Sequence, residues 1–249
     1  MTYKGIILAA GRGSRMKSLT EEHPKCMVHL DGKMLLEWQE EAIQAAGIND
    51  IVVIGGYNAD KLPNRFETLC NTRWSETNMV SSLLVANDIL EKKHSIISYS
   101  DIVYSHDHIQ RLKECDGDIC ITYDALWYEL WSQRFENPLD DAETFIIHDN
   151  ILQEIGSKTD SLEDIQGQYM GLLKFTPKGW SQVQSILQKL TQDQCDKLDM
   201  TSLLSLILQK NIKISTVQVL GKWCEVDSDT DLEIYTQLLQ HKWSHNWKS

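Results

Sequence analysis

The sequence of 249 residues has no Pro/Ser/Gly-rich stretch, no low-complexity run and no internal repeat. It also has no apolar run of transmembrane length, and no charged N-terminal region followed by an apolar signal core. A chain of this length can bury a full core as one large domain. We therefore expect a single domain over residues 1–242, a short tail at 243–249, and neither a membrane anchor nor a leader.

Cysteine spacing typical of metal or disulfide proteins is also missing. The chain has six cysteines, none of them in a Cys-x-x-Cys pair: Cys26, Cys70, Cys115, Cys120, Cys195 and Cys224. Such scattered thiols argue against a zinc site or a disulfide framework and indicate a reducing compartment. We expect a cytoplasmic protein.

Excess positive charge is absent from the chain as a whole, whose formal net charge is -12. This balance argues against nucleic acid as a partner, and we expect no membrane partner either. The first 36 residues differ, because their basic residues outnumber their acidic ones: Lys4, Arg12, Arg15, Lys17, Lys25 and Lys33 against Glu21, Glu22 and Asp31. A basic segment in an acidic protein indicates a local site for a small anion, such as a triphosphate bound with metal.

Two common nucleotide-binding motifs and a histidine-centred catalytic group are also missing. No Gly-Lys pair is followed by Ser or Thr, which excludes a Walker loop. Met16 stands where a dinucleotide-binding fingerprint needs a third glycine or alanine after Gly11 and Gly13. The eight histidines are scattered and mostly flanked by polar residues, so we expect them at the surface.

The most informative segment that is present spans residues 6–25, IILAAGRGSRMKSLTEEHPK. Its opening apolar run is typical of a buried parallel strand, and Gly11 and Gly13 let the backbone turn and approach a ligand closely. Arg15 offers a planar fork of donors that suits phosphate, and Lys25 adds a compact positive charge. The segment predicts a cradle for nucleotide phosphates at the carboxyl end of the first strand. The alternative is an ordinary strand–turn–helix with exposed basic residues.

The rest of the chain predicts an α/β fold. Helical periodicity at 34–46 and 77–90 alternates with apolar strands at 51–54 and 94–100, and Gly47 is expected to end the first helix. This order predicts right-handed crossovers and a Rossmann-like, doubly wound, mainly parallel sheet. From Asp118 on, the pattern becomes strand-rich in four segments, some of which are expected to be antiparallel additions that form a substrate lobe. Further elements are expected at 180–190, 201–209 and 230–242 as helices and at 212–219 as a strand.

The pattern Leu-Ala-Ala-Gly-x-Gly-x-Arg plus Pro-Lys resembles the MobA-like NTP transferase superfamily, whose sugar-nucleotidyltransferase-like members join an NTP to a phosphorylated compound and release pyrophosphate. Residues 5–39 look like the start of bacterial CTP:phosphocholine cytidylyltransferases and related phosphonate cytidylyltransferases. Further matches are Ile51-Val-Val-Ile-Gly-Gly-Tyr57, Asn78-Met-Val-x-Ser-Leu83, Ser98-Tyr-Ser-Asp101 and Glu225-Val-Asp-Ser228. The resemblance implies a nucleotide-diphospho-sugar transferase fold.

A reaction between two anions needs neutralising charge, which divalent metal and fixed basic groups supply. Mg²⁺ binds carboxylates, phosphates and water. Asp101 ends an apolar strand at the edge where a doubly wound sheet binds ligands, and Glu225 and Asp227 share one face if their segment is extended. We expect Asp101, Asp227 and Glu225 to hold Mg²⁺, with a turn or N-cap role as the alternative for Asp101. An ionised phosphate acceptor needs no general base.

The resemblance further implies which residues bind the nucleotide and act in catalysis. Nucleotide-binding residues would be Leu8, Ala9, Ala10, Gly11, Arg12, Gly13, Ser14, Tyr57, Asn78 and Ser82, and catalytic residues would be Arg15, Lys25, Asp101 and Asp227. Arg15 and Lys25 would hold the triphosphate. Tyr57 and Asn78 also allow a purely structural interpretation, as the end of a strand and the cap of a helix.

The acceptor is expected to contact segment 123–145, which concentrates aromatic and acidic residues. Aromatic faces and carboxylates suit an ammonium group. The acceptor-binding candidates are Trp127, Glu129, Trp131, Arg134, Gln168, Tyr169 and Asp199. Arg134 departs from a pure cation cage and would grip a phosphonate or carboxylate instead. The alternative is an amphipathic helix that buries its tryptophans.

Together these features predict an enzyme that transfers CMP from CTP-Mg²⁺ to a small phosphorylated or phosphonate acceptor, phosphocholine-like or an alkylphosphonate, and releases pyrophosphate. One alternative is a sugar-1-phosphate nucleotidyltransferase that uses UTP or dTTP. Another is a catalytically silent nucleotide-binding regulator, which should lack a basic loop residue or a metal carboxylate. Trp243 and Trp247 suggest a contact surface between two copies of the chain, as in a homodimer.

Overall fold

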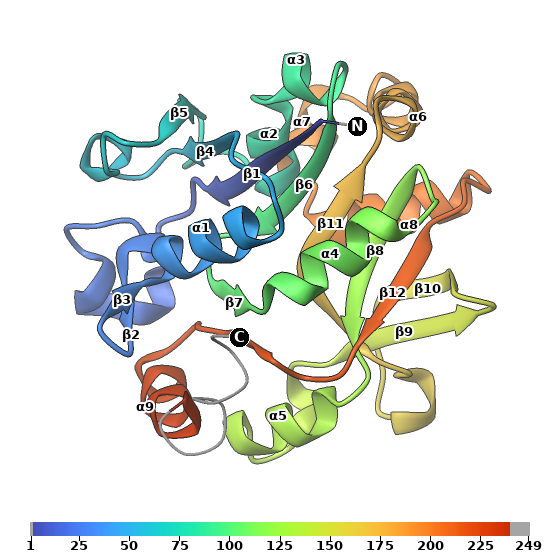
Figure 1. Cartoon of the computed structure of the whole chain (residues 1–249). Coiled ribbons are helices and arrows are strands. Elements are labelled where there is room, and N and C mark those ends of the chain that lie inside the picture. The colour runs from blue at the N-terminus through green and yellow to red at the C-terminus, as the bar shows by residue number, and fades with distance from the viewer. Residues whose placement is uncertain (1, 240–249) are drawn as a thin grey trace.

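The computed structural model of the chain describes residues 2–239, and its centre is one nine-stranded sheet with helices on both faces (Figure 1). In spatial order the strands are β5 (Glu67–Cys70), β4 (Ile51–Gly55), β1 (Tyr3–Ala9), β6 (His94–Tyr99), β11 (Gln168–Phe175), β8 (Ile119–Asp124), β12 (Ser215–Val219), β10 (Ile151–Lys158) and β9 (Glu143–His148). Strands β11 and β10 run opposite to the other seven strands of the nine. The predicted α/β fold with a mainly parallel sheet and antiparallel additions is confirmed.

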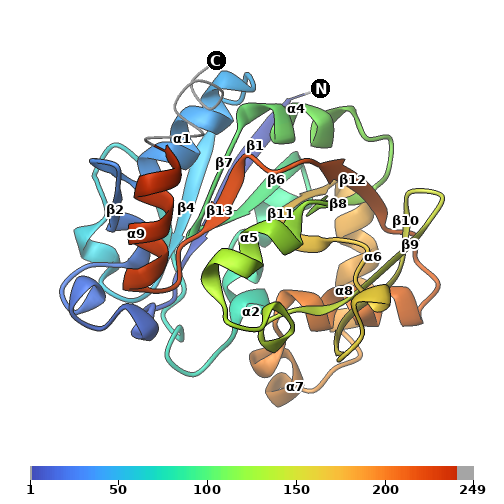
Figure 2. The same cartoon turned by 90° about the horizontal axis from the view of Figure 1, so that it is seen from below.

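Helices and small ribbons connect these strands. The helices are α1 (Leu35–Ala45), α2 (Met79–Leu84), α3 (Asn87–Leu90), α4 (His106–Glu114), α5 (Trp127–Arg134), α6 (Pro177–Leu187), α7 (Gln192–Lys197), α8 (Met200–Gln209) and α9 (Asp229–Leu238), and the short 3-10 turns are η1 (Ser14–Thr20), η2 (Lys25–Met27), η3 (Ala59–Lys61), η4 (Pro138–Asp140) and η5 (Leu162–Asp164). Two antiparallel ribbons join β2 (His29–Leu30) to β3 (Lys33–Met34), and β7 (Ile102–Tyr104) to β13 (Trp223–Glu225). Figure 2 shows α5 and α9 side by side next to β13. None of the helices in the described part of the chain has both the length and the hydropathy needed to cross a bilayer.

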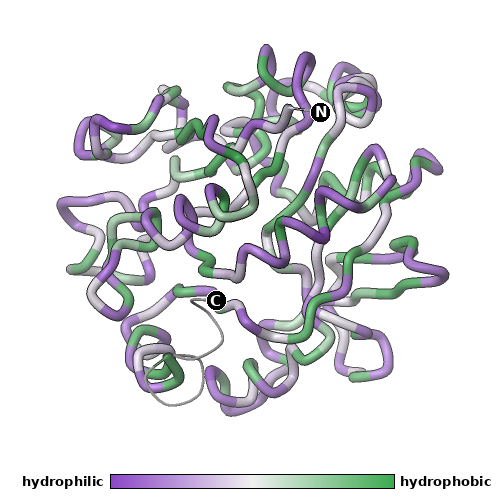
Figure 3. The backbone as a smooth tube through the Cα atoms, viewed as in Figure 1, coloured by the Kyte–Doolittle hydropathy of each residue, from purple (hydrophilic) through white to green (hydrophobic). Residues whose placement is uncertain are grey.

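The alternation of side chains along β1 explains the two covered faces. Ile7 and Ala9 point into a core that includes residues of α1 and α4, whereas Ile6 and Leu8 point into a second core with residues of α2, α6 and α8. In Figure 3 the flanking helices alternate between hydrophobic and hydrophilic stretches, as helices with one buried face must. The carboxyl end of β1 therefore opens between two packed layers.

Most of the expected elements form, and the differences have local causes. Gly47 follows α1 with a φ of +81°, which confirms its role in ending that helix. The helix expected at 77–90 divides into α2 and α3, because Val85 and Ala86 hydrogen-bond to the carbonyls of Ser82 and Leu83, three residues back (3.2 and 3.0 Å). Such tighter turns interrupt the α-helical ladder.

Two further expectations concern histidine and the C-terminus. His108, expected at the surface, lies on the buried face of α4. Burial lowers its pKa to about 3 and keeps the imidazole neutral. Its helix was not predicted, because α4 is mostly polar and its amphipathic pattern rests on two aliphatic residues, Ile109 and Leu112. The domain limit at residue 242, the tail at 243–249 and both tail tryptophans lie outside the described residues.

Candidate functional site

The loop after β1 brings a lysine back against a glycine. Gly13 has a φ of +68°, and a Cβ atom there would lie 2.9 Å from the Cβ of Lys25. The hydroxyl of Thr20 donates to the Gly13 carbonyl oxygen over 2.9 Å and closes the loop between them. Because glycine alone lacks that Cβ, the stem of Lys25 passes directly over the loop.

Lys25 is the centre of the charged site. Its Nζ lies 2.9 Å from Asp101 Oδ2 and also donates to Asp227 Oδ1. Burial alone would lower the pKa of Lys25, but the two carboxylates outweigh this effect and raise it. Arg15 reaches Asp227 Oδ2 over 3.1 Å, although 69% of its side chain is exposed. The structure thus brings together the four residues predicted to be catalytic.

The three acidic residues predicted as metal ligands also meet. Asp101, Glu225 and Asp227 offer oxygen atoms that lie within 4.8 Å of one another. The ribbon of β7 and β13 places them, because Val226 N donates to the Asp101 carbonyl oxygen over 2.8 Å. Asp101 Oδ1 is buried and accepts no hydrogen bond from the described residues. An orphaned carboxylate oxygen in such a group fits a divalent cation.

The charges of this group are strongly coupled. Burial and the neighbouring Asp227 carboxylate raise the pKa of Glu225 to about 7. Burial also opposes ionisation of Asp227, but Lys25 and then Arg15 lower its pKa overall. Burial and repulsion therefore oppose ionisation of Glu225, and a bound cation would favour its carboxylate form.

Arg134 lies behind the carboxylates rather than on an open acceptor surface. Only 2% of its side chain is exposed, and it lies with its guanidinium carbon 4.9 Å from the centre of the Trp131 ring. Its Nε is 2.9 Å from Asp231 Oδ1, one terminal nitrogen is 3.1 Å from Glu225 Oε2, and the other is 3.7 Å from Asp227 Oδ2. This geometry favours a positioning role for Arg134 over the expected grip on an acceptor.

A cavity of about 130 Å³ adjoins the loop on the side of α2. It is lined by Leu8, Ala10, Gly11, Trp74, Thr77, Asn78, Met79 and Ser82, of which Leu8, Ala10, Gly11, Asn78 and Ser82 were predicted to bind the nucleotide. Asn71 supports it by donating to the hydroxyls of Ser82 and Thr77, each over 3.0 Å. Asn78 Oδ1 also accepts from Met79 N over 2.8 Å, so this residue both lines the cavity and caps α2. We call it the base cavity.

Tyr57 and Ala9 lie behind the base cavity. The Tyr57 ring packs 5.3 Å from the Trp74 ring and 5.5 Å from the Arg12 guanidinium, and its backbone N donates to Ala10 O over 3.0 Å. Ala9 is 2% exposed in the core. Trp74, which does line the cavity, was missed because a single tryptophan in a polar loop carries no pattern.

A second cavity, of about 270 Å³, continues from the base cavity to the charged residues. Its lining comprises Leu8, Gly11, Gly13, Ser14, Arg15, Lys25, Met79, Tyr99, Ser100, Asp101 and Asp227. Leu8, Gly11 and Met79 line both cavities, which are therefore adjacent. We call it the phosphate cavity, because its lining combines the two basic side chains predicted to bind phosphate with two of the carboxylates predicted to bind metal.

A third cavity, of about 250 Å³, extends from the phosphate cavity under α5 and α8. It is lined by Met79, Tyr99, Trp131, Asp141, Glu143, Gln168, Tyr169, Met170, Gly171, Asp199, Met200, Thr201, Trp223 and Glu225. It includes four of the residues predicted to bind the acceptor, namely Trp131, Gln168, Tyr169 and Asp199. We call it the acceptor cavity.

The acceptor cavity is acidic and contains buried polar atoms that have no hydrogen-bond partner among the described residues. Burial, with repulsion from Asp199 and Asp141, raises the pKa of Glu143 although Lys158 partly offsets the effect, so a cation bound beside Glu143 would be favourable. Gln168 Oε1 and Trp131 Nε1 are buried and make no hydrogen bond within the described residues. A group of carboxylates with a free amide oxygen suits a cation that donates hydrogen bonds. Asp141 and Glu143 belong to the acidic segment noted in the sequence, but their meeting with Asp199 was not predicted.

The remaining acceptor candidates lie elsewhere on α5. Trp127 is 4% exposed and packs in the core, as the amphipathic-helix interpretation expected, and Glu129 is exposed on the outer side of the helix. Two basic residues of the N-terminal segment also lie apart from the site. Lys4 pairs with Asp50 over 2.6 Å, and Lys33 lies 4.2 Å from the centre of the Trp38 ring.

Comparison with known proteins identifies relatives of this chain. Residues 5–156 match the family described as MobA-like NTP transferase domain. The CTP:phosphoglutamine cytidylyltransferase of Campylobacter jejuni is 38% identical over 246 residues, which cover 92% of this chain and 97% of the relative. The 2-aminoethylphosphonate cytidylyltransferase of Lancefieldella rimae is 36% identical over 110 residues, which cover 42% of this chain and 45% of the relative. The solved CTP:phosphocholine cytidylyltransferase of Streptococcus pneumoniae shares the fold, with a TM-score of 0.73 at 21% identity over 96% of this chain and 100% of that one.

Proposed function

We propose that the acceptor of this enzyme carries a primary ammonium group in addition to its phosphate. The chain belongs to the family of MobA-like NTP transferase domains and is a cytidylyltransferase that acts on a phosphorylated acceptor. The acidic acceptor cavity is the observation that supports this proposal. Phosphoglutamine, named for the Campylobacter relative, is the first acceptor to test.

The polar atoms of the acceptor cavity distinguish a primary from a quaternary ammonium. Asp141, Glu143, Asp199 and Gln168 all offer oxygen atoms, which accept hydrogen bonds. A primary ammonium has three N–H donors to satisfy them, whereas a quaternary ammonium has none and depends on aromatic faces. A phosphorylated primary amine or amino acid therefore fits this cavity better than phosphocholine does.

We propose the following mechanism from the order of the three cavities. CTP places its base in the base cavity and its triphosphate beside Arg15 and Lys25. An ionised oxygen of the acceptor phosphate attacks the α-phosphorus of CTP, a new P–O bond forms, and the bond to pyrophosphate breaks. Arg15 and Lys25 stabilise the charge that develops on the phosphate oxygens. The acceptor cavity binds the ammonium end of the acceptor and so keeps the attacking oxygen in position.

A divalent cation, Mg²⁺ in our proposal, would be held by Asp101, Glu225 and Asp227 and would neutralise phosphate charge. The buried, unpartnered Oδ1 atom of Asp101 supports this assignment. Arg134 would keep the carboxylates of Glu225 and Asp227 oriented. We also propose that the protein works in the cytoplasm and that two copies associate.

The proposal is tested by measuring pyrophosphate release with Mg²⁺ for the four NTPs and dTTP against a panel of acceptors. The panel contains phosphoglutamine, phosphoethanolamine, 2-aminoethylphosphonate, phosphocholine and glucose 1-phosphate. We expect release with CTP alone among the nucleotides, and a higher kcat/KM for acceptors with a primary ammonium than for phosphocholine. Release with UTP or dTTP and glucose 1-phosphate would contradict the proposal. Binding of CTP without any turnover would support the silent regulator.

Replacing Glu143 by Gln is expected to lower kcat/KM for an ammonium-bearing acceptor by about tenfold to 100-fold, because a hydrogen bond to a charged group contributes about 1.5–3 kcal/mol. The KM for CTP should stay unchanged, since Glu143 lines only the acceptor cavity among the three. Steady-state kinetics with each substrate varied in turn will measure both. Glu129→Gln, on the exposed side of α5, is the matched control. If only Glu129→Gln lowered kcat/KM, the acceptor would bind at the outer face of α5 and the proposed acceptor cavity would be wrong.

A further inference from the structure

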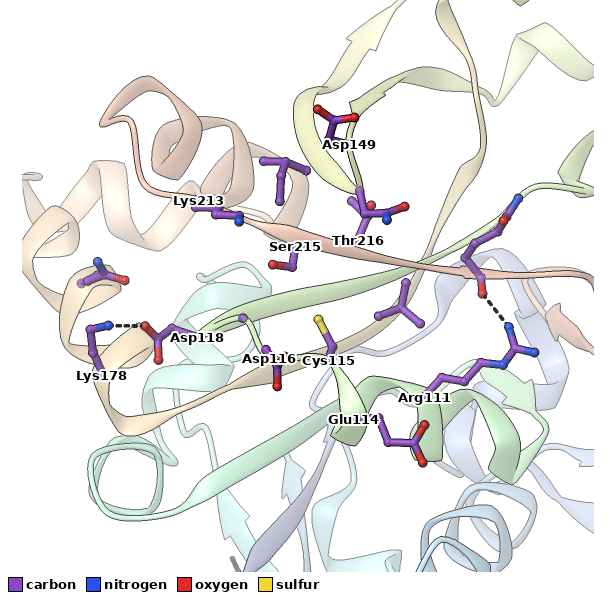
Figure 4. A pocket seen from close by; sticks show the side chains of 16 residues that line it. Arg111, Glu114, Cys115, Asp116, Asp118, Asp149, Lys178, Lys213, Ser215 and Thr216 are labelled. Carbon is purple, nitrogen blue, oxygen red and sulfur yellow. Dashed lines mark hydrogen bonds and ion pairs between the residues drawn. The ribbon is translucent and has the colours of Figure 1, made fainter.

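Figure 4 shows a cavity of about 910 Å³, whose lining shares no residue with the three cavities of the proposed site. Its lining includes Arg111 and Cys115 near the end of α4, and Ser215 at the start of β12. Strands β8, β12, β1 and β6 run in the same direction, and Asp101 follows the carboxyl end of β6. The cavity is therefore at the opposite edge of the sheet, where β8 and β12 begin.

Two cysteines meet at this cavity. Cys115 follows α4, lines the cavity and is partly exposed, whereas Cys120 in β8 is fully buried behind it. Their Sγ atoms are 2.8 Å apart. The partly exposed Cys115 thus lies in contact with the buried Cys120.

The loop between the two cysteines packs closely against the Cys120 sulfur at Gly117. A Cβ at Gly117 would lie 2.9 Å from Cys120 Sγ, so a side chain there would press on the pair. The hydrogen bond from Cys120, followed by the Gly117 backbone and the charge of Lys174, lowers the pKa of Cys115 to about 6. The same hydrogen bond, with burial, raises the pKa of Cys120. The shared hydrogen bond thus favours the thiolate, which is the nucleophilic form, on Cys115 and the protonated thiol on Cys120.

The other cysteines lie in different surroundings. Cys26 and Cys224 are buried, and burial raises the pKa of both thiols, to about 12 for Cys26. Burial also raises the pKa of Cys195. Cys70, in the edge strand β5, is exposed and provides a natural control for simple accessibility.

We propose that Cys115 and Cys120 form a redox-active dithiol that small-molecule disulfides oxidise through this cavity. The Cys115 thiolate attacks one sulfur of the disulfide, forms a mixed disulfide and releases one thiolate. The Cys120 sulfur then loses its proton, attacks Cys115 Sγ and releases the second small thiol, which leaves a Cys115–Cys120 disulfide. Two protein thiols are oxidised and one small disulfide is reduced to two thiols, so atoms and electrons balance.

The test is to incubate the folded wild-type chain, which keeps Cys70 as the accessible control, with oxidised glutathione and to map its thiols by mass spectrometry. We expect the peptide that spans residues 115–120 to lose two hydrogens and to resist alkylation until it is reduced. Because the attacking form is the thiolate, the reaction should be about tenfold slower at pH 5 than at pH 7.5. The thiol measurement does not depend on CMP transfer, so it tests the dithiol separately from the proposed function.

Two variants separate the two steps. Cys120→Ala should stop the reaction at a stable glutathione adduct on Cys115, and Cys115→Ser should prevent both the adduct and the internal disulfide. Cys115→Ser changes a partly exposed atom, so it keeps the test decisive if the buried Cys120→Ala variant fails to fold. Glutathione on the wild-type Cys70 with free thiols at Cys115 and Cys120 would overturn the proposal. So would a disulfide that forms only in denaturant.

Discussion

Replacing Lys25 by Met is expected to lower kcat for CMP transfer by roughly 100-fold or more, because the variant loses the charge aimed at the phosphates. Methionine keeps an unbranched stem that can pack over Gly13, where the Lys25 side chain lies. Asp227 would still be neutralised by Arg15 and Arg134, so the variant should fold. Pyrophosphate release at saturating CTP will measure the change.

The matched control for this prediction is Lys33→Met, which removes the same charge from a lysine outside the phosphate cavity. We expect the kcat of this control to match the wild type. If Lys25→Met instead raised the KM for CTP and left kcat unchanged, Lys25 would serve ground-state binding only. Its place at the centre of the charged site would then have been misinterpreted.

Replacing Asp101 by Asn is expected to lower kcat/KM by roughly 1,000-fold, which corresponds to about 4 kcal/mol of transition-state stabilisation by a bound cation. Asparagine keeps one oxygen for Lys25 and removes the negative charge that a metal needs. Asp101 offers an oxygen within 4.8 Å of the other two carboxylates, so the cation should bind more weakly too. Calorimetric titration with Mn²⁺, in addition to activity, will measure that affinity directly.

Asp229→Asn provides the comparison, since Asp229 lies two residues after Asp227 and is exposed at the start of α9. Its Mn²⁺ affinity and turnover should equal those of the wild type. Equal Mn²⁺ affinity in Asp101→Asn and the wild type would refute the metal assignment, even if activity fell. Such a result would leave Asp101 with the turn role that its position also allows.

The meeting of the loop after β1 with the three carboxylates could be predicted because these residues follow elements with a clear pattern. Gly13, Lys25 and Asp101 follow buried strands or turns, and parallel strands bring their carboxyl ends to one edge of the sheet. The role of Arg134 could not be predicted in this way. Its partners Glu225 and Asp231 are 91 and 97 residues away, and no local pattern connects them.

The acceptor cavity shows a second limit of sequence reasoning. Trp127 and Trp131 are four residues apart on α5 and look alike in the sequence, yet Trp131 lines the cavity and Trp127 does not. Likewise, Glu143 and Asp199 meet because the far edge of the sheet packs against α8. Periodicity predicts which residues lie on a helix face, but the packing of distant elements decides what that face contacts.

The hydrogen bond between Lys25 and Asp227 joins residues 202 positions apart, and this has a consequence for the chain as it leaves the ribosome. At synthesis rates of about 5–20 residues per second, Lys25 precedes Asp227 by roughly 10–40 s. Arg134 is likewise synthesised well before its partners Glu225 and Asp231. Each of these cations would cost several kcal/mol if buried without its partner. The nascent chain must therefore keep them hydrated, and the charged centre closes only after the segment from Glu225 to Asp231 has emerged.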